Sequence, residues 1–279
     1  HLKDRLWFKD EDDFKVGMNY VAVLSATRPA LILSFVLMSN HVHFVLESMQ
    51  ADATNFINEF KTIYSKYFRR KYLSKELLRE NKIDIQEVST NDEGLERAIA
   101  YVQMNSVAAN ICSHPSQWPW GTGNSFFNRN KPAGRAVSSL SRRALYRLTH
   151  SGFDGLPGEW IICNDGYFLP EMYVDVSFVE SRFHSPNRMN YFLSSSSKAK
   201  KRFESTSDNL PAFRDQSILV AIPDLCRSLF QKASFKDLSD DDRSELVRQI
   251  RFRFSADAKQ IARICGISYE EAAKLLDRL

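Results

Sequence analysis

The sequence predicts an α+β fold, a two-layer sandwich with a central antiparallel sheet, followed by a mostly helical C-terminal region. Three observations support this prediction. In the N-terminal part of the chain, segments with apolar residues at helical spacing alternate with short runs of strand-forming residues. Residues 121–139, rich in Gly, Asn and Ser, then interrupt the pattern, and from Ile218 onward the spacing is helical again. This order favours helices packed on an antiparallel sheet.

The first predicted elements are a helix and a β-hairpin. Residues 9–26 begin with acidic side chains and continue with apolar residues at helical spacing, as expected of a helix with acids near its N-terminus. Residues 30–38 and 41–47 are two strand-like runs separated by Ser39-Asn40. Because Ser and Asn favour turns, the two runs are predicted to pair as a hairpin.

Two further helices and two candidate strands complete the N-terminal unit. Aromatic and apolar side chains from Phe56 to Phe68 line a second helix, and residues 91–110 have the pattern of a third. Residues 82–88 alternate like a strand between these helices, and residues 1–8 are a candidate for the first strand.

The composition suggests how the chain is divided. With 279 residues it is long for one average domain. We expect an α+β domain at 1–128, a connector with short mixed elements and a Ser/Lys-rich linker at 129–208, and a helical domain at 209–279. Residues 255–279 have the shape of a helix-turn-helix, which could read duplex DNA or serve as a packing unit. Two serines look like the start of capping boxes, Ser239 with Asp242 and Ser268 with Glu271.

Charge, cysteine spacing and hydropathy argue against several classes of protein. The formal net charge of +4 is weak evidence for a polyanionic partner. The four cysteines are far apart, which argues against a disulfide framework or a zinc site and suits a reducing cytoplasm. No apolar run reaches the roughly 20 residues of a membrane helix. We therefore expect a cytoplasmic protein with no membrane partner.

Two histidines in the second predicted strand are the first candidate for chemistry. His41 and His43 flank Val42, so on a strand both imidazoles point to one face and Val42 points to the other. Neutral imidazole is the commonest metal ligand in proteins, and a sheet interior is a costly place for titratable groups without partners. The alternative is a pair of hydrogen-bonded histidines on a half-buried strand.

Tyr101 and Asn105 are four residues apart on the third predicted helix, so they share a face. A helix lying on the sheet could aim both at the histidine pair. Asn105 then offers an amide oxygen as a third metal ligand, and Tyr101 is a candidate nucleophile. The alternative is a packing tyrosine at the edge of a core helix.

Residues 60–72 interleave basic and aromatic side chains. We expect several aromatics to pack on the sheet and the remaining side chains to track phosphates or stack on bases, although a solvated charged face is the alternative. The candidate nucleic-acid contacts are Lys61, Lys66, Arg69, Arg70, Lys71 and Tyr72.

Four segments occur in the order of a known family: residues 35–47 (FVLMSNHVHFVLE), 60–72, 98–111 and 115–127. The chain resembles the one-tyrosine HUH transposases that act on single-stranded DNA, especially their REP-associated relatives. The resemblance covers residues 1 to about 128 and implies a ferredoxin- or RRM-like palm. Ser39 and Ser106 stand where the family usually has prolines, and residues 73–84 replace a Trp/Gly-rich loop that contacts DNA in relatives.

The resemblance implies a mechanism and its partners. His41 and His43 would hold Mg²⁺ or Mn²⁺, with Asn105 as an extra ligand, and Tyr101 would attack the scissile phosphate to give a 5′-phosphotyrosine and a free 3′-hydroxyl. A 3′-hydroxyl then reverses the step and joins DNA. The expected partner is single-stranded or hairpin DNA, with duplex DNA at the C-terminal helices, bound by a monomer or homodimer associated with the bacterial nucleoid.

Two other hypotheses remain at this point. A domesticated, non-catalytic protein could keep the fold and recognise DNA hairpins. An RNA-directed protein on a similar sheet is disfavoured because the aromatic-rich strand motif of the RNA-recognition fold is missing.

Overall fold

A β-hairpin lies at the centre of the N-terminal region. The computed structural model describes residues 6–74, 83–90, 93–130, 132–196, 215–254, 256 and 258–277. Strand β1 (Leu31–Met38) pairs antiparallel with β2 (His41–Glu47), and the pairs Met38–His41 and Val36–His43 set the register. The predicted hairpin and its turn are therefore confirmed. Every residue of β1 after Leu31 is buried, as expected of a strand covered on both faces.

Two long helices cover one face of the hairpin. Helix α1 (Glu11–Thr27) begins at the N-cap Asp10, and α2 (Gln50–Tyr72) buries aromatic residues against the sheet. The ring of Phe44 on β2 lies 5.6 Å from that of Phe56 and 6.0 Å from that of Phe60. Because neighbouring side chains of a strand point to opposite faces, His41 and His43 point away from α2.

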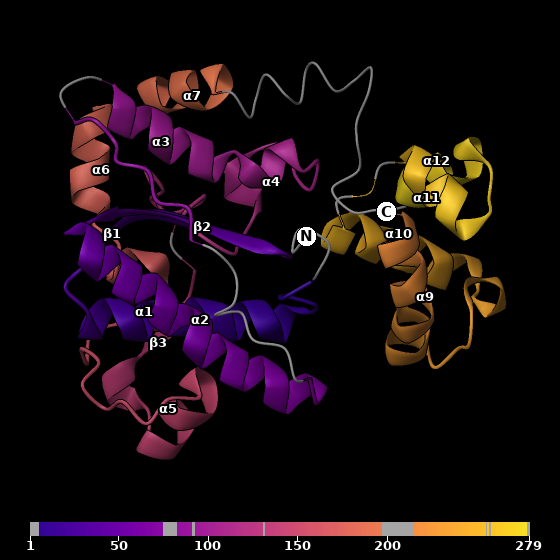
Figure 1. Cartoon of the computed structure of the whole chain (residues 1–279), viewed down its shortest axis with the longest axis horizontal. Coiled ribbons are helices and arrows are strands. Elements are labelled where there is room, and N and C mark those ends of the chain that lie inside the picture. The colour runs from indigo at the N-terminus through magenta and orange to yellow at the C-terminus, as the bar shows by residue number, and fades with distance from the viewer. Residues whose placement is uncertain are drawn as a thin grey trace.

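Helix α3 (Gly94–Gln103) and the short α4 (Asn105–Ala108) lie on the opposite face of the hairpin from α1 and α2 (Figure 1). The expected α+β class is confirmed, because helices combine with small antiparallel sheets and a largely helical C-terminal region. A two-layer sandwich with one central sheet is not confirmed, since helices cover both faces of a two-stranded hairpin.

The predicted strand at residues 82–88 is wrong in its described part. Residues 83–89 have no regular structure, and Lys82 lies outside the described residues. The free edge of β1 is already occupied, because Leu37 N donates to Trp120 O (2.8 Å) and Asp175 N donates to Ile32 O (3.0 Å). An alternating segment becomes a strand only where an edge is open to it. Residues 6–8 form no strand either, and residues 1–5 are outside the described part.

The middle of the chain adds short elements to the same hydrophobic core. Buried side chains from Val137 to Leu193 pack in one cluster with those of the hairpin, α1 and α2. The domain boundaries expected at 128 and 208 stay a prediction. The elements of this part are η2 (Pro115–Gln117), β3 (Gly134–Ala136), η3 (Val137–Ser139), α5 (Arg142–Thr149), β4 (Ile161–Cys163), η4 (Pro170–Met172), α6 (Val176–Phe183) and α7 (Pro186–Ser195).

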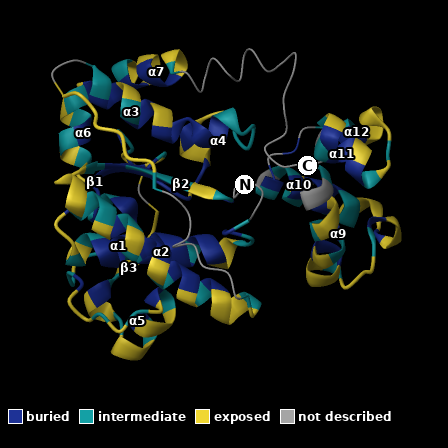
Figure 2. Cartoon of the chain, viewed as in Figure 1, coloured by how far each residue is buried: buried dark blue, intermediate teal, exposed yellow. Residues whose placement is uncertain are grey.

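The C-terminal helices enclose a second hydrophobic cluster, with exposed residues on their outer faces (Figure 2). Ser239 Oγ accepts from Asp242 N (3.3 Å) and Ser268 Oγ accepts from Glu271 N (3.1 Å), as the capping pattern predicts. Within the described residues, no helix combines the length and hydropathy required to cross a bilayer. The elements are α9 (Asp215–Phe230), η5 (Phe235–Asp237), α10 (Asp240–Phe254), α11 (Ala258–Cys265) and α12 (Tyr269–Asp277).

Candidate active site

The two histidines of β2 stand side by side on the face that α3 covers. The ring centroids of His41 and His43 lie 4.9 Å apart with an interplanar angle of 81°. His41 is exposed and His43 is partly buried, whereas Val42 between them packs on the core of the opposite face. This is the arrangement that the strand period of two predicts. The two imidazoles are close enough for one cation to reach both.

The turn residue Asn40 fixes the orientation of His41. Its Oδ1 lies 2.7 Å from His41 Nδ1. Because a carboxamide oxygen only accepts, His41 Nδ1 carries the proton in this pair, and Nε2 is left with the lone pair that a metal ion needs. The sequence indicates Asn40 only as a turn former. An Asn directly before a candidate ligand histidine is the signal that could have revealed this second role.

Helix α3 brings Tyr101 to the histidine pair. The ring centroid of Tyr101 lies 5.8 Å from that of His43, and the rings are nearly perpendicular at 87°. Tyr101 is 39% exposed, whereas its neighbours Ala100 and Val102 are buried. The tyrosine therefore lies beside the apolar stripe of the helix, as its spacing predicts, and its side chain is accessible to a large substrate.

Asn105 stabilises the backbone beneath Tyr101. Helix α3 ends at Gln103 and α4 begins at Asn105, which leaves carbonyls of the last turn without helical donors. Asn105 Nδ2 donates to Tyr101 O (2.9 Å) and to Val102 O (3.0 Å). Since both partners are carbonyls, the amide nitrogen must be the donor. The amide oxygen takes no part in these two bonds, so a ligand role for it is compatible with this capping.

Residues far along the chain hold α3 in place. Glu96 has a buried side chain, and its carboxylate pairs with Arg182 of α6 at 3.3 Å and with Arg188 of α7 at 4.0 Å. Arg188 also pairs with Glu93 at 3.3 Å. These arginines lie in the expected connector and are not among the predicted site residues, because nothing in the local sequence indicates which helix they contact.

The donor atoms at the site suit a cation with nitrogen and oxygen ligands. In the part of the chain that the structure describes, no group of three or more His, Cys, Asp or Glu side chains could hold a metal ion. A cation at His41 and His43 would therefore take its other ligands from groups of another kind, such as an amide oxygen, a phosphate or water. Imidazole nitrogen fits Mn²⁺ better than Mg²⁺, which prefers oxygen alone.

The N-terminal third of the chain matches a known protein family. Residues 5–91 match the model of the family described as "Transposase IS200 like". This segment belongs to the IS200-like transposases. No significant match was found among curated proteins or among solved structures. His41 and His43 lie inside the matched residues, whereas Tyr101 and Asn105 follow them.

The transposase family implies a DNA-processing enzyme with a DNA partner, which directs attention to the basic helix α2. Lys66, Arg69 and Arg70 are exposed, and no ion pair among the described residues involves them. Lys61 is buried, and burial lowers the pKa of its ammonium group. The exposed three suit a phosphate-contacting face better than Lys61 does.

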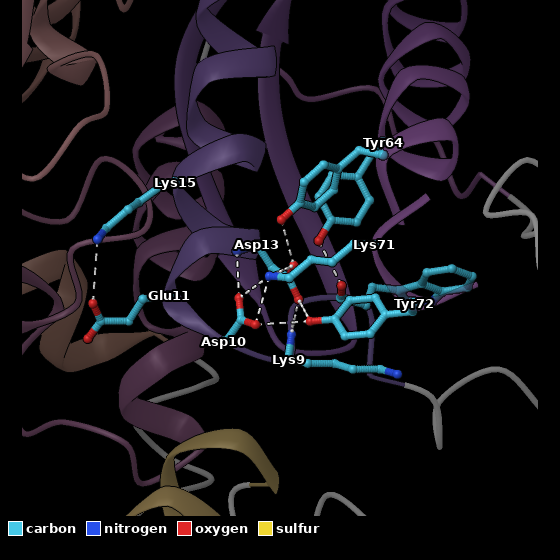
Figure 3. Close-up of polar contacts among 10 residues, drawn as sticks. Lys9, Asp10, Glu11, Asp13, Lys15, Tyr64, Lys71 and Tyr72 are labelled. Carbon is cyan, nitrogen blue, oxygen red and sulfur yellow. Dashed lines mark hydrogen bonds and ion pairs between the residues drawn. The ribbon is translucent and has the colours of Figure 1, made fainter. Parts of the chain in front are cut away.

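The other two candidate DNA contacts belong to an intramolecular cluster at the end of α2 (Figure 3). Lys71 Nζ pairs with Asp10 at 2.7 Å and with the fully buried Asp13 at 2.9 Å. Tyr72 OH donates to Asp13 Oδ2 (2.8 Å) and to Asp10 Oδ2 (3.1 Å). Their contact with DNA stays a prediction, and binding there would compete with these bonds.

The pKa values in the cluster follow from these contacts. Burial raises the pKa of Asp10, but its bonds with Lys71 and the Asp13 backbone outweigh burial and leave the pKa below the usual value. Burial lowers the pKa of Lys71, and its bonds with Asp10 and Asp13 reverse the direction and raise it. Burial and the charge of Asp13 raise the pKa of Tyr72. At neutral pH Asp10 is therefore a carboxylate, Lys71 an ammonium group and Tyr72 a neutral phenol.

Proposed function

We propose that the protein is a metal-dependent single-stranded DNA endonuclease and strand transferase that works through a 5′-phosphotyrosine intermediate. The single observation that supports this most is the 5.8 Å separation of the Tyr101 and His43 rings, because a nucleophile and a metal ligand must act on the same phosphate. The match of residues 5–91 to the IS200-like transposases supplies the substrate class.

The proposed first step breaks one phosphodiester bond and forms another. The Tyr101 oxygen attacks the phosphorus and loses its proton, and the bond from phosphorus to the 3′ oxygen breaks. The 3′ oxygen takes up a proton to become a hydroxyl, so the step neither gains nor loses protons overall. An incoming 3′-hydroxyl reverses the step, releasing Tyr101 and joining the strands. Bond energy is retained in the phosphotyrosine, so the reaction needs no nucleotide cofactor.

His41, His43 and the amide oxygen of Asn105 would hold Mg²⁺ or Mn²⁺. When bound, such a cation acts as a Lewis acid that stabilises negative charge on the phosphate and on the phenolate. Asn40 holds the ring of His41 by its Nδ1 atom, which keeps Nε2 directed away from the turn. The exposed face of Tyr101 leaves room for the strand to approach.

The exposed Lys66, Arg69 and Arg70 on α2 would bind phosphates of the strand away from the scissile phosphate, because α2 covers the face of the hairpin opposite to the histidines. Lys61, Lys71 and Tyr72 remain weaker candidates because of their burial or their acidic partners.

A contact of α11 and α12 with duplex DNA is a further proposal. It rests on two helices joined by a turn at Gly266, whose φ of 66° suits glycine.

The test is covalent capture of DNA. The full chain is incubated with labelled hairpin-bearing single strands and Mn²⁺, and the products are separated on a denaturing gel. We expect a protein–DNA adduct that requires Mn²⁺ and Tyr101. Binding without an adduct on any such substrate would instead identify a non-catalytic hairpin-binding protein.

A further inference from the structure

We propose that α5 and the C-terminal part of α2 form a second nucleic-acid-binding surface, which holds single-stranded DNA away from the histidine–tyrosine site. We call it the α5–α2 surface. It consists of Lys66, Arg70, Arg143, Tyr146, Arg147 and His150, all of them exposed. It lies partly outside the residues that match the transposase family, since α5 follows residue 91.

The arginines of α5 are available for an anion. Arg143 and Arg147 are four residues apart and therefore share one face of the helix. Neither takes part in any hydrogen bond or ion pair found among the described residues. The neighbouring Arg142 differs, because it pairs with Asp154. Two guanidinium groups on one face are suited to successive phosphates of a strand.

An exposed aromatic ring lies beside these cations. Tyr146 is 53% exposed, whereas Leu145 of the same helix is buried and holds α5 on the core. The exposed part of this tyrosine offers a face on which an unpaired base can stack. Single-strand-binding proteins combine such stacking rings with cations. Duplex bases are already stacked, so this ring favours a single strand.

The surface continues onto α2. His150 is the C-cap of α5, and its ring lies 5.5 Å from that of Tyr67 on α2. Burial, Arg70 and Lys71 together lower the pKa of His150, which agrees with a positive potential at this junction. Arg70 is exposed there, and Lys66 lies one turn earlier. Two acids near this end of α2, Asp10 and Asp13, are already paired with Lys71.

The position of the surface separates it from the cutting site. Helix α5 packs on α1, on the side of the hairpin away from α3 (Figure 1). The ring of His43 lies against Tyr101 of α3 and therefore faces away from α5. A nucleotide bound on this surface cannot at the same time present its phosphate to Tyr101. The surface would therefore hold a segment of the DNA strand that lies away from the phosphodiester bond being cleaved. The choice of single-stranded DNA rests on the proposed function, whereas the charge and exposure of the surface do not.

The test measures how binding depends on salt, in a Tyr101→Phe background without divalent metal, so that no cleavage occurs. Fluorescence anisotropy follows a labelled single strand bound to the full chain. Arg143→Gln combined with Arg147→Gln should make the slope of log K against log salt shallower by about 1.4, since each lost phosphate contact accounts for about 0.7 on a single strand. Arg142→Gln, one residue away, is the matched control and should leave the slope unchanged.

Tyr146→Ala should weaken binding of the single strand about 5- to 150-fold, the range expected for one lost stacked base. A blunt duplex should show no loss with this variant. An unchanged salt slope in the arginine variant, an unchanged affinity in Tyr146→Ala, or equal losses on duplex would each overturn the proposal. Circular dichroism checks that the variants stay folded, as expected for exposed side chains.

The two proposals fail separately. If the protein with an intact Tyr101 forms a covalent adduct while the α5–α2 variants bind normally, the proposed surface is refuted and the proposed cleavage by Tyr101 is supported. If the variants lose binding while no adduct ever forms, the proposed surface is supported and the proposed cleavage by Tyr101 is refuted.

Discussion

The ring of Tyr101 lies nearly perpendicular to that of His43, with centroids 5.8 Å apart, although the two residues come from a helix and a strand separated by α2 along the chain. The hairpin register puts His43 on the face opposite to Phe44, and α3 covers that face. This relationship supports the proposed chemistry, and most of the following predictions test it or the residues around it.

Tyr101→Phe removes one oxygen from an exposed side chain. We expect DNA affinity and thermal stability to stay unchanged, because the ring and its contacts remain. The covalent adduct should disappear on a denaturing gel. Adduct formation or nicking by Tyr101→Phe would show that another group is the nucleophile.

His41→Ala removes one of the two imidazoles. We expect Mn²⁺ binding, measured by isothermal titration calorimetry, to weaken beyond detection, while circular dichroism stays unchanged because His41 is exposed. His184→Asn is a suitable control, since His184 has a φ of 61°, which Asn tolerates, and no proposed role. Equal Mn²⁺ affinity in His41→Ala and the unmodified protein would rule out the ligand role.

Asn40→Ala removes the acceptor that holds His41 Nδ1. We expect Mn²⁺ affinity to fall about 10- to 100-fold, the usual cost of losing an outer partner of a metal ligand. Nitrogen chemical shifts of the His41 ring, recorded without metal at mildly alkaline pH, should move toward a mixture of tautomers. Asn40→Asp keeps an acceptor and should retain one tautomer. If Asn40→Ala leaves both the ring shifts and the affinity unchanged, Asn40 does not position His41.

Lys71→Met leaves the buried Asp13 without its cation. We expect the free energy of unfolding to fall by about 2 kcal/mol, less than for a fully buried pair because Lys71 is partly exposed and the tyrosine hydroxyls still donate. Urea denaturation measures the change. Lys66→Met, on the exposed face of the same helix, should change stability by less than about 0.5 kcal/mol. Equal effects of the two substitutions would contradict the structural role of Lys71.

Asp215 links α9 with α11, because it pairs with Arg263 and accepts from Gln260 Nε2 at 2.9 Å. The bonds with Arg263 lower the pKa of Asp215 to about 2. The unfolded carboxyl has the higher pKa, so the stabilisation is present above about pH 4 and is lost as the pH falls toward 2.

Asp215→Asn should therefore be less stable than the unmodified protein by about 1 kcal/mol at pH 6, a figure reduced for solvent screening of this partly exposed pair. The difference should shrink toward zero near pH 2. Denaturation curves at both pH values measure it. A difference that does not depend on pH would mean that the charge of Asp215 contributes nothing.

The local pattern of the sequence was sufficient for the elements that carry the candidate site. The alternation around Val42 is a property of any strand, so it places His41 and His43 on one face before any packing is known. The spacing of Tyr101 and Asn105 likewise places them on one side of a helix. The hairpin, helices α1 to α3 and the capping serines of the C-terminal region were predicted correctly for the same reason.

Only the tertiary structure decided which faces meet. Whether α3 lies over the histidines depends on long-range contacts, among them the pairing of Glu96 with Arg182, which no local pattern encodes. The alternating residues 83–88 failed to form a strand because the segments around Trp120 and Asp175 already occupy the edge of β1. Lys71 and Tyr72 look like DNA contacts by type, yet their acidic partners come from α1, and a partner distant in sequence is visible only once the chain has folded.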